Sequence, residues 1–182
     1  MVKGVDELDG LEANDAAEAA EAAVWSALGS VHDPEIPLLS IVDLGIVERV
    51  EIADDVVRVQ LLPTFAGCPA LDAIHQDVRY AVAAAAPGKG IEVRFVHSPP
   101  WTSDRITRSG QEALRAYGLT PPSGAGPVMI ALGGLRRPAR CPFCGSEETD
   151  LESAFGPSLC RSVQFCRSCR NPFEAFKPKL PR

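Results

Sequence analysis

Three segments of the chain alternate apolar and polar residues, the pattern typical of half-buried β-strands. In IVERVEIA at 46–53 and VVRVQLL at 56–62, apolar side chains recur at every second position over most of the run. The ADD between the two runs is typical of a tight turn, so we expect these strands to form a hairpin. IEVRFV, at 91–96, predicts a third strand.

A segment with helical periodicity lies between the second and third of these predicted strands. Leu71, Ile74, Val78 and Val82 recur at steps of three and four residues. This spacing places them on one face of a helix and predicts an amphipathic helix. The helix should end near APGKG, because proline and glycine cannot readily continue it.

Capping residues predict two further helices. Asp15 and Glu18 form a capping box for an alanine-rich helix over residues 16–28, and Gly29 follows it as a stop signal. Ser or Asp within the pair at 103–104 caps another helix that runs to Tyr117.

These elements divide the chain into four parts. Residues 1–15 are acidic and without period, which predicts a disordered tail. Residues 16–118 form an α/β (α+β) domain with a small mixed sheet. Residues 119–138 are rich in glycine and proline and predict a linker with one short strand at 128–132. Residues 139–182 form a second module.

Charge also separates the two modules. Residues 1–133 contain 9 Lys and Arg against 19 Asp and Glu, whereas residues 134–182 contain 9 against 5. The acidic first module disfavours nucleic acid as the main partner. The sequence has no apolar run long enough to span a membrane and no secretory signal, so we expect a soluble cytoplasmic protein. In that compartment six cysteines indicate metal ligands or reactive thiols rather than disulfides.

Four of these cysteines form two C-x-x-C pairs in the second module. Cys141 and Cys144 lie in CPFCG, and Cys166 and Cys169 lie in CRSCR. Two such turns can direct four thiolates at one tetrahedral ion, so the pattern predicts a zinc ribbon. Mononuclear iron or an iron–sulfur cluster accepts the same four ligands, and the spacing does not exclude either. Cys160 fits neither pair, and we interpret it as a buried small residue or an incidental thiol. The alternative is a fifth ligand that exchanges with another cysteine.

Cys68 lies where the second strand is predicted to give way to the amphipathic helix. Gly67 permits an unusual turn, and Pro69 suits the first turn of a helix. Cys68 would then be the N-cap, where the helix dipole lowers a thiol pKa. This context makes Cys68 a candidate functional thiol. Its alternative is a small buried residue.

Several polar residues of the loops are candidates for the surroundings of this thiol. Asp33 and Glu35 lie in HDPEIP, Asp43 lies in SIVDLG, and Thr64 precedes the cysteine. The commonest use of such aspartates is to cap turns and helices, so each one taken alone predicts little.

Two of these motifs also resemble a known family. DPEIPLLSIVDLGIV at 33–47 and PTFAGCPALDAI at 63–74 resemble the MIP18 family, also called domain of unknown function 59 (DUF59) or the SufT-like family. This similarity covers about residues 17–118. With WTSDRITRSGQEALRAYGLTPP at 101–122 and the C-terminal cysteines, nearly the whole chain resembles the D-subunit family (PaaD, or PaaJ) of the ring-1,2-phenylacetyl-CoA epoxidase system.

The resemblance implies a maturation role in aerobic phenylacetate catabolism. MIP18-type domains are associated with iron–sulfur cluster assembly and delivery, and the family's functional cysteine matches Cys68. Its acidic loop matches Asp33 and Glu35. The implied partners are the oxygenase and reductase subunits of the epoxidase system. Zinc would be structural, and iron or a cluster would be held transiently. One thiolate cannot hold a cluster alone, so a homodimer or a partner would complete the site.

Other functions remain open at this point. The chain could be a structural or electron-transfer-coupling subunit of the oxygenase complex without metal transfer. A catalytic di-iron subunit is disfavoured, because the chain has no Glu-x-x-His pair on a helical pattern. A thiol oxidoreductase is disfavoured because Cys68 has no C-x-x-C partner. We therefore expect a component of an epoxidase system that is not catalytic alone.

Overall fold

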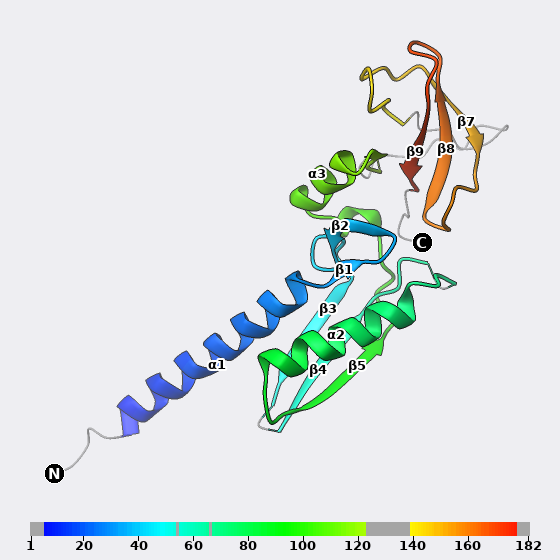
Figure 1. The fold of residues 1–182 in the computed structure, drawn as a ribbon. Helices are drawn as coiled ribbons and strands as arrows, with labels where there is room; N and C mark the ends of the chain where they lie inside the picture. The colour runs from blue at the N-terminus through cyan, green and yellow to red at the C-terminus, as the bar shows by residue number, and fades with distance from the viewer. Residues whose placement is uncertain (1–5, 54, 66, 123–138, 178–182) are drawn as a thin grey trace.

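The computed structural model describes residues 6–53, 55–65, 67–122 and 139–177. The long helix α1 leads into a small α/β unit, and a ribbon of strands lies at the opposite end (Figure 1). The helices are α1 (Asp6–Gly29), α2 (Leu71–Ala85) and α3 (Arg108–Ala116). The strands are β1 (His32–Asp33), β2 (Ile36–Ser40), β3 (Val47–Ile52), β4 (Val56–Leu61), β5 (Gly90–Phe95), β6 (Leu119–Thr120), β7 (Thr149–Ser153), β8 (Arg161–Cys166) and β9 (Pro172–Phe176).

The central sheet confirms the pattern of alternating residues. Strand β3 pairs with β4 in antiparallel orientation, and β5 pairs with β4 in parallel orientation. Helix α2 makes the crossover that a parallel pair requires. Its predicted apolar stripe is buried through Ile74, Val78 and Val82. The α+β fold class is therefore confirmed.

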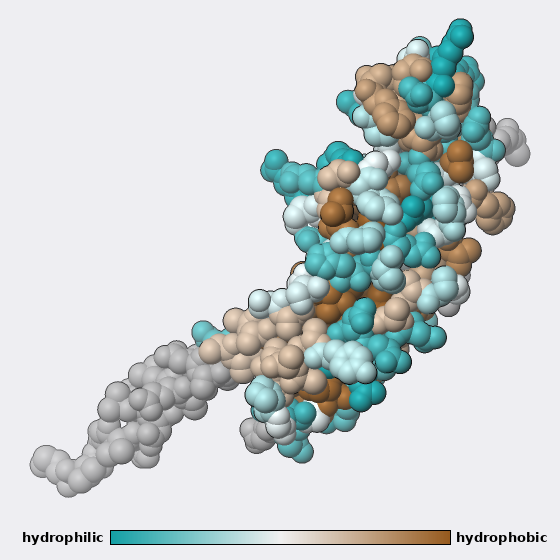
Figure 2. All heavy atoms as spheres, in the orientation of Figure 1, coloured by the Kyte–Doolittle hydropathy of each residue, from teal (hydrophilic) through white to brown (hydrophobic). Residues whose placement is uncertain are grey.

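Helix α1 begins well before the predicted start at Ala16. It runs from Asp6, so the prediction of disorder for residues 1–15 is wrong from Asp6 onward, and residues 1–5 lie outside the described ranges. Asp15 lies inside the helix instead of capping it. The segment is rich in Ala, Glu and Leu, which are strong helix formers. This propensity favours a helix although apolar residues do not recur at helical spacing. The alanine-rich part of the helix gives the pale brown surface beside the domain in Figure 2.

The region between α1 and β3 is more ordered than a loop. Strands β1 and β2 form a two-stranded antiparallel ladder that includes part of HDPEIP, which we expected to lie in a loop. Gly45 follows with φ 70°, and a Cβ there would lie 2.3 Å from the carbonyl oxygen of Arg105. Only glycine allows this close approach of the two backbones.

The predicted helix at 103–117 is divided in two. Ser103–Arg105 form one turn of 3-10 helix, and α3 starts only after Thr107, whose side chain accepts a hydrogen bond from the Gly110 amide. The prediction that Ser103 or Asp104 caps the helix is therefore wrong. Ile106, between the two pieces, has an extended backbone and is buried in the core.

The ribbon shares a sheet with the first module. Strands β7, β8 and β9 are antiparallel, and β6 adds to β9 in parallel orientation. Leu119 and Thr120, the first residues of the predicted linker, thus belong to the ribbon sheet. The strand predicted at 128–132 lies outside the described residues. Phe176 of β9 packs in the main core, where its ring lies 6.1 Å from that of Trp101.

Candidate functional site

The four cysteines of the ribbon come from two equivalent turns. In the first, the Gly145 amide donates to the carbonyl of Cys141 at 2.9 Å, and in the second the Arg170 amide donates to that of Cys166 at 2.9 Å. Gly145 and Arg170 both have positive φ, at 75° and 60°. The two C-x-x-C pairs therefore adopt the same local fold and face each other.

The sulfur atoms of this cluster fit one tetrahedral ion. All four lie within 4.8 Å of one another, and the Cys141–Cys169 and Cys144–Cys166 Sγ pairs are each 3.6 Å apart. A metal–sulfur bond of about 2.3 Å implies tetrahedral edges of about 3.8 Å. A disulfide would bring two sulfurs to about 2.05 Å. The structure therefore brings together the four cysteines predicted to bind the metal, Cys141, Cys144, Cys166 and Cys169, at separations that suit one ion.

Electrostatics within the cluster favour a bound cation. The backbone amide of Asn171 lowers the pKa of Cys169 to about 6. The Ser146 amide lowers the pKa of Cys144, but loss of solvation and its three cysteine neighbours raise it to about 12. Cys169 therefore loses its proton easily, and its negative charge then opposes the deprotonation of a second cysteine in the cluster. A divalent cation removes that opposition.

Cys68 lies just before α2 rather than at its N-cap. The N-cap is Ala70, and the Cys68 amide donates to the carbonyl of Phe65 in a separate turn. Cys68 is half-buried, and burial raises its pKa, to which the charges of Asp33, Cys160 and Glu35 add. The prediction of a thiol with a lowered pKa is therefore wrong. The turn after β4 displaces the helix start beyond the cysteine, so burial, with a smaller contribution from nearby acids, outweighs the helix dipole.

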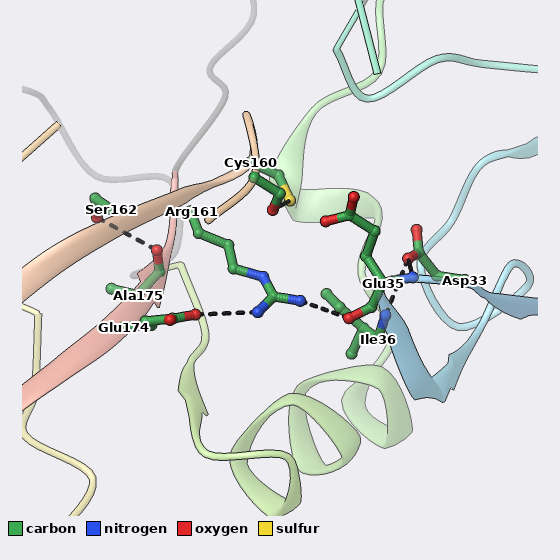
Figure 3. A network of polar contacts seen from close by, with 9 residues as sticks. Asp33, Glu35, Ile36, Cys160, Arg161, Ser162, Glu174 and Ala175 are labelled. Carbon is green, nitrogen blue, oxygen red and sulfur yellow. Dashed lines mark hydrogen bonds and ion pairs between the residues drawn. The ribbon is translucent and has the colours of Figure 1, made fainter. Parts of the chain in front are cut away.

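Asp33 and Glu35 lie close to this thiol. Both raise the pKa of Cys68 through their charge. The Asp33 carboxylate accepts hydrogen bonds from the amides of Glu35 and Ile36 at 2.7 and 3.1 Å (Figure 3). Burial raises the pKa of Asp33 in spite of these bonds. The structure thus places two acidic groups of the β1–β2 turn in the electrostatic surroundings of Cys68.

Asp43 has a different position and holds the start of α3. Its carboxylate accepts hydrogen bonds from Thr107 at 2.6 Å, from Ser40 at 2.8 Å and from Ser109. These contacts fix the loop after β2 to the cap of α3. Thr64, the last of the predicted supporting residues, lies between β4 and Cys68.

The contacts of Asp43 predict a dependence of stability on pH. Hydrogen bonds from Ser109 and Thr107 lower the pKa of Asp43. A lowered pKa gives stability that is present above the unfolded value of about 3.9 and is lost as pH falls through the folded value. We expect Asp43→Asn to lower the denaturation midpoint at neutral pH, with a difference that shrinks in acid. Urea denaturation of both proteins from pH 7 to pH 3 measures this, and an equal difference at all pH values would contradict it.

Cys160 also lies in these surroundings, which its spacing in the sequence did not suggest. Its thiol is 3.1 Å from the Ser158 hydroxyl, and its charge raises the pKa of Cys68. Cys68 and Cys160 are both partly buried against the same hydrophobic core. Cys160 enters this group only through the packing of the ribbon against the first module.

Known protein families match both halves of the chain. Residues 21–95 match a family described as "Iron-sulfur cluster assembly protein", and residues 125–177 match one described as "PaaD zinc beta ribbon domain". In the part of the chain that the structure describes, no helix is long and apolar enough to cross a membrane.

Individual proteins are similar over the same regions. An Escherichia coli K12 protein provisionally named as the D subunit of 1,2-phenylacetyl-CoA epoxidase is 36% identical, covering 85% of this chain and 90% of that protein. The Fe-S protein maturation auxiliary factor SufT of Staphylococcus aureus is 38% identical, covering 46% and 96%. The crystal structure of a DUF59 domain from Bacillus anthracis matches with a TM-score of 0.50 at 33% identity, covering 53% and 92%.

Proposed function

The chain belongs to the family of phenylacetyl-CoA epoxidase D subunits, PaaD, and on that premise we propose that it handles iron or an iron–sulfur cluster for this epoxidase system through Cys68. It is an accessory subunit with a maturation role. The similarity of its first module to iron–sulfur maturation factors supports this role.

The observation that carries the proposal is the group of acids around Cys68. The thiol of Cys68 is half-buried, and Asp33, Glu35 and the thiol of Cys160 lie in its electrostatic surroundings. A negative charge on any of these three groups makes it harder for Cys68 to lose its proton. Without a cation the thiol stays protonated at neutral pH. Iron compensates these charges, and its binding releases the thiol proton. Such a group suits reversible binding of a cation.

The ribbon has a separate, structural role in this proposal. Its four cysteines hold one zinc ion, because the 3.6 Å sulfur separations match a mononuclear tetrahedral site. An iron–sulfur cluster would hold the sulfurs farther apart, since several iron and sulfide atoms would lie between them. Mononuclear iron has similar geometry, and metal analysis of the purified protein distinguishes it from zinc.

The receiving proteins are the oxygenase and reductase subunits of the epoxidase system. Cys68 alone supplies one thiolate, whereas a cluster needs several ligands. The receiving subunit or a second copy of this chain therefore supplies further ligands. The protein is cytoplasmic with these partners and works neither on nucleic acid nor at a membrane.

The proposal predicts that Cys68→Ser abolishes cargo transfer without unfolding the protein. The half-buried position accepts serine, which is nearly the same size. The full-length protein would be loaded anaerobically with Fe³⁺ and sulfide, the components of an oxidised two-iron cluster, and mixed with the iron–sulfur reductase of the system after removal of its iron. Recovery of the reductase's visible absorption measures transfer. Ser26→Ala, exposed on α1, serves as the control and should transfer like the unchanged protein.

Unchanged transfer by the Cys68→Ser protein would refute the proposal. The zinc content and far-ultraviolet circular dichroism of each variant establish that a loss of transfer does not come from a loss of fold.

A further inference from the structure

The loop that precedes β8 brings Cys160 to the boundary between the two modules. Its neighbour Leu159 lies so close to the Cys68 turn that a Cβ on Gly67 would be 3.6 Å from its Cδ1 atom. The Cys160 carbonyl accepts a hydrogen bond of 2.7 Å from the amide of Lys177, which follows β9. The residues that precede the two cysteines thus approach each other, and the Cys160 backbone is fixed.

Arg161 anchors this loop to the acidic turn of the first module. Its guanidinium donates to Glu174 at 3.0 Å and to the backbone carbonyl of Glu35 at 2.5 Å (Figure 3). It also lies 5.5 Å from the ring centre of Tyr117. These contacts join the ribbon, the β1–β2 turn and the end of α3 at one point.

One donor of this arginine has no acceptor among the residues that the structure describes. Arg161 is only 8% exposed, and its Nε–H makes no hydrogen bond to any described residue. Figure 3 shows the guanidinium stretched from Glu174 to Glu35 with the sulfur of Cys160 beside it. Buried donors are almost always satisfied, so an orphaned one indicates a missing acceptor. A thiolate or a sulfide is an acceptor of suitable charge.

We propose that Cys160 of the ribbon is a second ligand for the cargo, and that Cys68 and Cys160 together hold one iron ion or one cluster at the boundary between the modules. This inference rests on the proposed function of Cys68 and adds the ribbon to the cargo site. Arg161 is a positioning residue, whose free Nε–H donates to the sulfur of the metal-bound group.

Electrostatics support this pairing. Burial and the negative charge of Asp33 raise the pKa of Cys160, and together they outweigh the Ser158 hydrogen bond and the Arg161 charge, which lower it. Asp33 acts on Cys68 in the same direction. The two thiols and this carboxylate therefore form one electrostatic group, although they come from different modules. A cation that binds both thiolates relieves the repulsion of all three.

An incomplete set of ligands suits a carrier. Among the described residues, the four ribbon cysteines are the only group of three or more His, Cys, Asp or Glu arranged as a metal site. The Cys68–Cys160 pair therefore leaves coordination positions for ligands from outside the chain. A receiving protein could replace the two thiolates in turn, whereas four closed ligands would retain the metal.

The first test measures whether the two thiols approach each other before any cargo is bound. Dibromobimane becomes fluorescent only after both of its ends react, so it reports a bridge between neighbouring thiols. We expect fluorescence from the zinc-loaded full-length protein, in which the four ribbon cysteines are occupied. Cys68→Ser and Cys160→Ser should each abolish it. The absence of fluorescence from the unchanged protein would overturn the inference.

The second test measures binding of Fe²⁺ alone to the zinc-loaded protein under anaerobic conditions. Thiolate-to-iron charge-transfer absorption gives the affinity. We expect Cys160→Ser to weaken binding at least tenfold. Ser162→Ala, two residues along on β8 with its hydroxyl directed to the Ala175 carbonyl, should bind as the unchanged protein does. Retained zinc in each variant establishes that the ribbon is folded.

The outcomes separate this inference from the function on which it rests. If Cys160→Ser binds iron normally and Cys68→Ser does not, the two-thiol site is wrong and the proposed function stands. If both variants bind iron normally, both proposals fail. If both lose binding and Ser162→Ala retains it, the cargo site spans the two modules.

Discussion

Replacing Cys166 by serine is expected to remove the bound metal and unfold the ribbon. Cys166 is fully buried, and the small core around it contains Cys141, Phe173 and Ala175. A core of this size cannot stabilise a ribbon alone. A structural zinc ion contributes about 10–16 kcal/mol to the folding of a small zinc module. The loss of one ligand removes most of that stabilisation.

Metal analysis and amide NMR spectra would measure this result. Ser168→Ala provides the control, because Ser168 lies in the same C-x-x-C turn but its exposed hydroxyl bonds only to Glu148 and Ser146 among the described residues. That variant should keep its metal and its dispersed amide signals. An ordered ribbon with its full metal content in Cys166→Ser would show that the fold does not depend on the cluster.

Trp101→Ala is expected to destabilise both modules by about 3–5 kcal/mol, the usual cost of truncating a buried tryptophan. Trp101 is 1% exposed and packs against Phe176 of the ribbon. Its indole N–H donates to the carbonyl of Leu44 at 3.0 Å, so the substitution also leaves a buried acceptor unpaired. Because this side chain joins the ribbon to the main core, its loss should weaken both.

Urea denaturation followed by circular dichroism would measure the change in unfolding free energy. Tyr80→Ala is the control, because Tyr80 is 73% exposed on α2 and its truncation should change the free energy by no more than about 0.5 kcal/mol. Trp101→Phe should lie between the two, since it keeps most of the ring but loses the hydrogen bond. Equal stability of Trp101→Ala and Tyr80→Ala would contradict the central role of this contact.

Elements whose side chains alternate or repeat regularly were predictable from the sequence. Strands β3, β4 and β5 and helix α2 follow their apolar pattern because one face of each packs on the core, where it is buried in β4 and α2 and mostly half-buried in β3 and β5. The β1–β2 ladder carries two prolines in a short segment and has no such pattern. It forms because the residues around it cover its apolar side chains, and local propensity does not encode that environment.

The candidate site likewise contains residues that the sequence predicted and others that it did not. The four metal-binding cysteines were predictable because two C-x-x-C turns encode their geometry locally. The proximity of Cys160 to Cys68 depends on how the ribbon packs against the first module. The spacing of residues within either segment does not indicate that proximity. The raised pKa of Cys68 was missed for a related reason, because the burial that mainly causes it, and the acids that add to it, come from parts of the chain distant in sequence.

Strand β6 changes what a cut between the modules would do. Leu119 and Thr120 precede residues 123–138 in the chain, yet they pair with Glu174 and Ala175 of β9. Proteolysis within 123–138 would therefore leave two fragments that share a sheet, and they should stay associated after the chain is broken. A ribbon fragment that begins after Thr120 and is produced alone would instead lack this outer strand and expose the hydrogen-bonding edge of β9, which favours self-association. The two modules are thus better produced as complementing fragments cut after Pro122 than as separate domains.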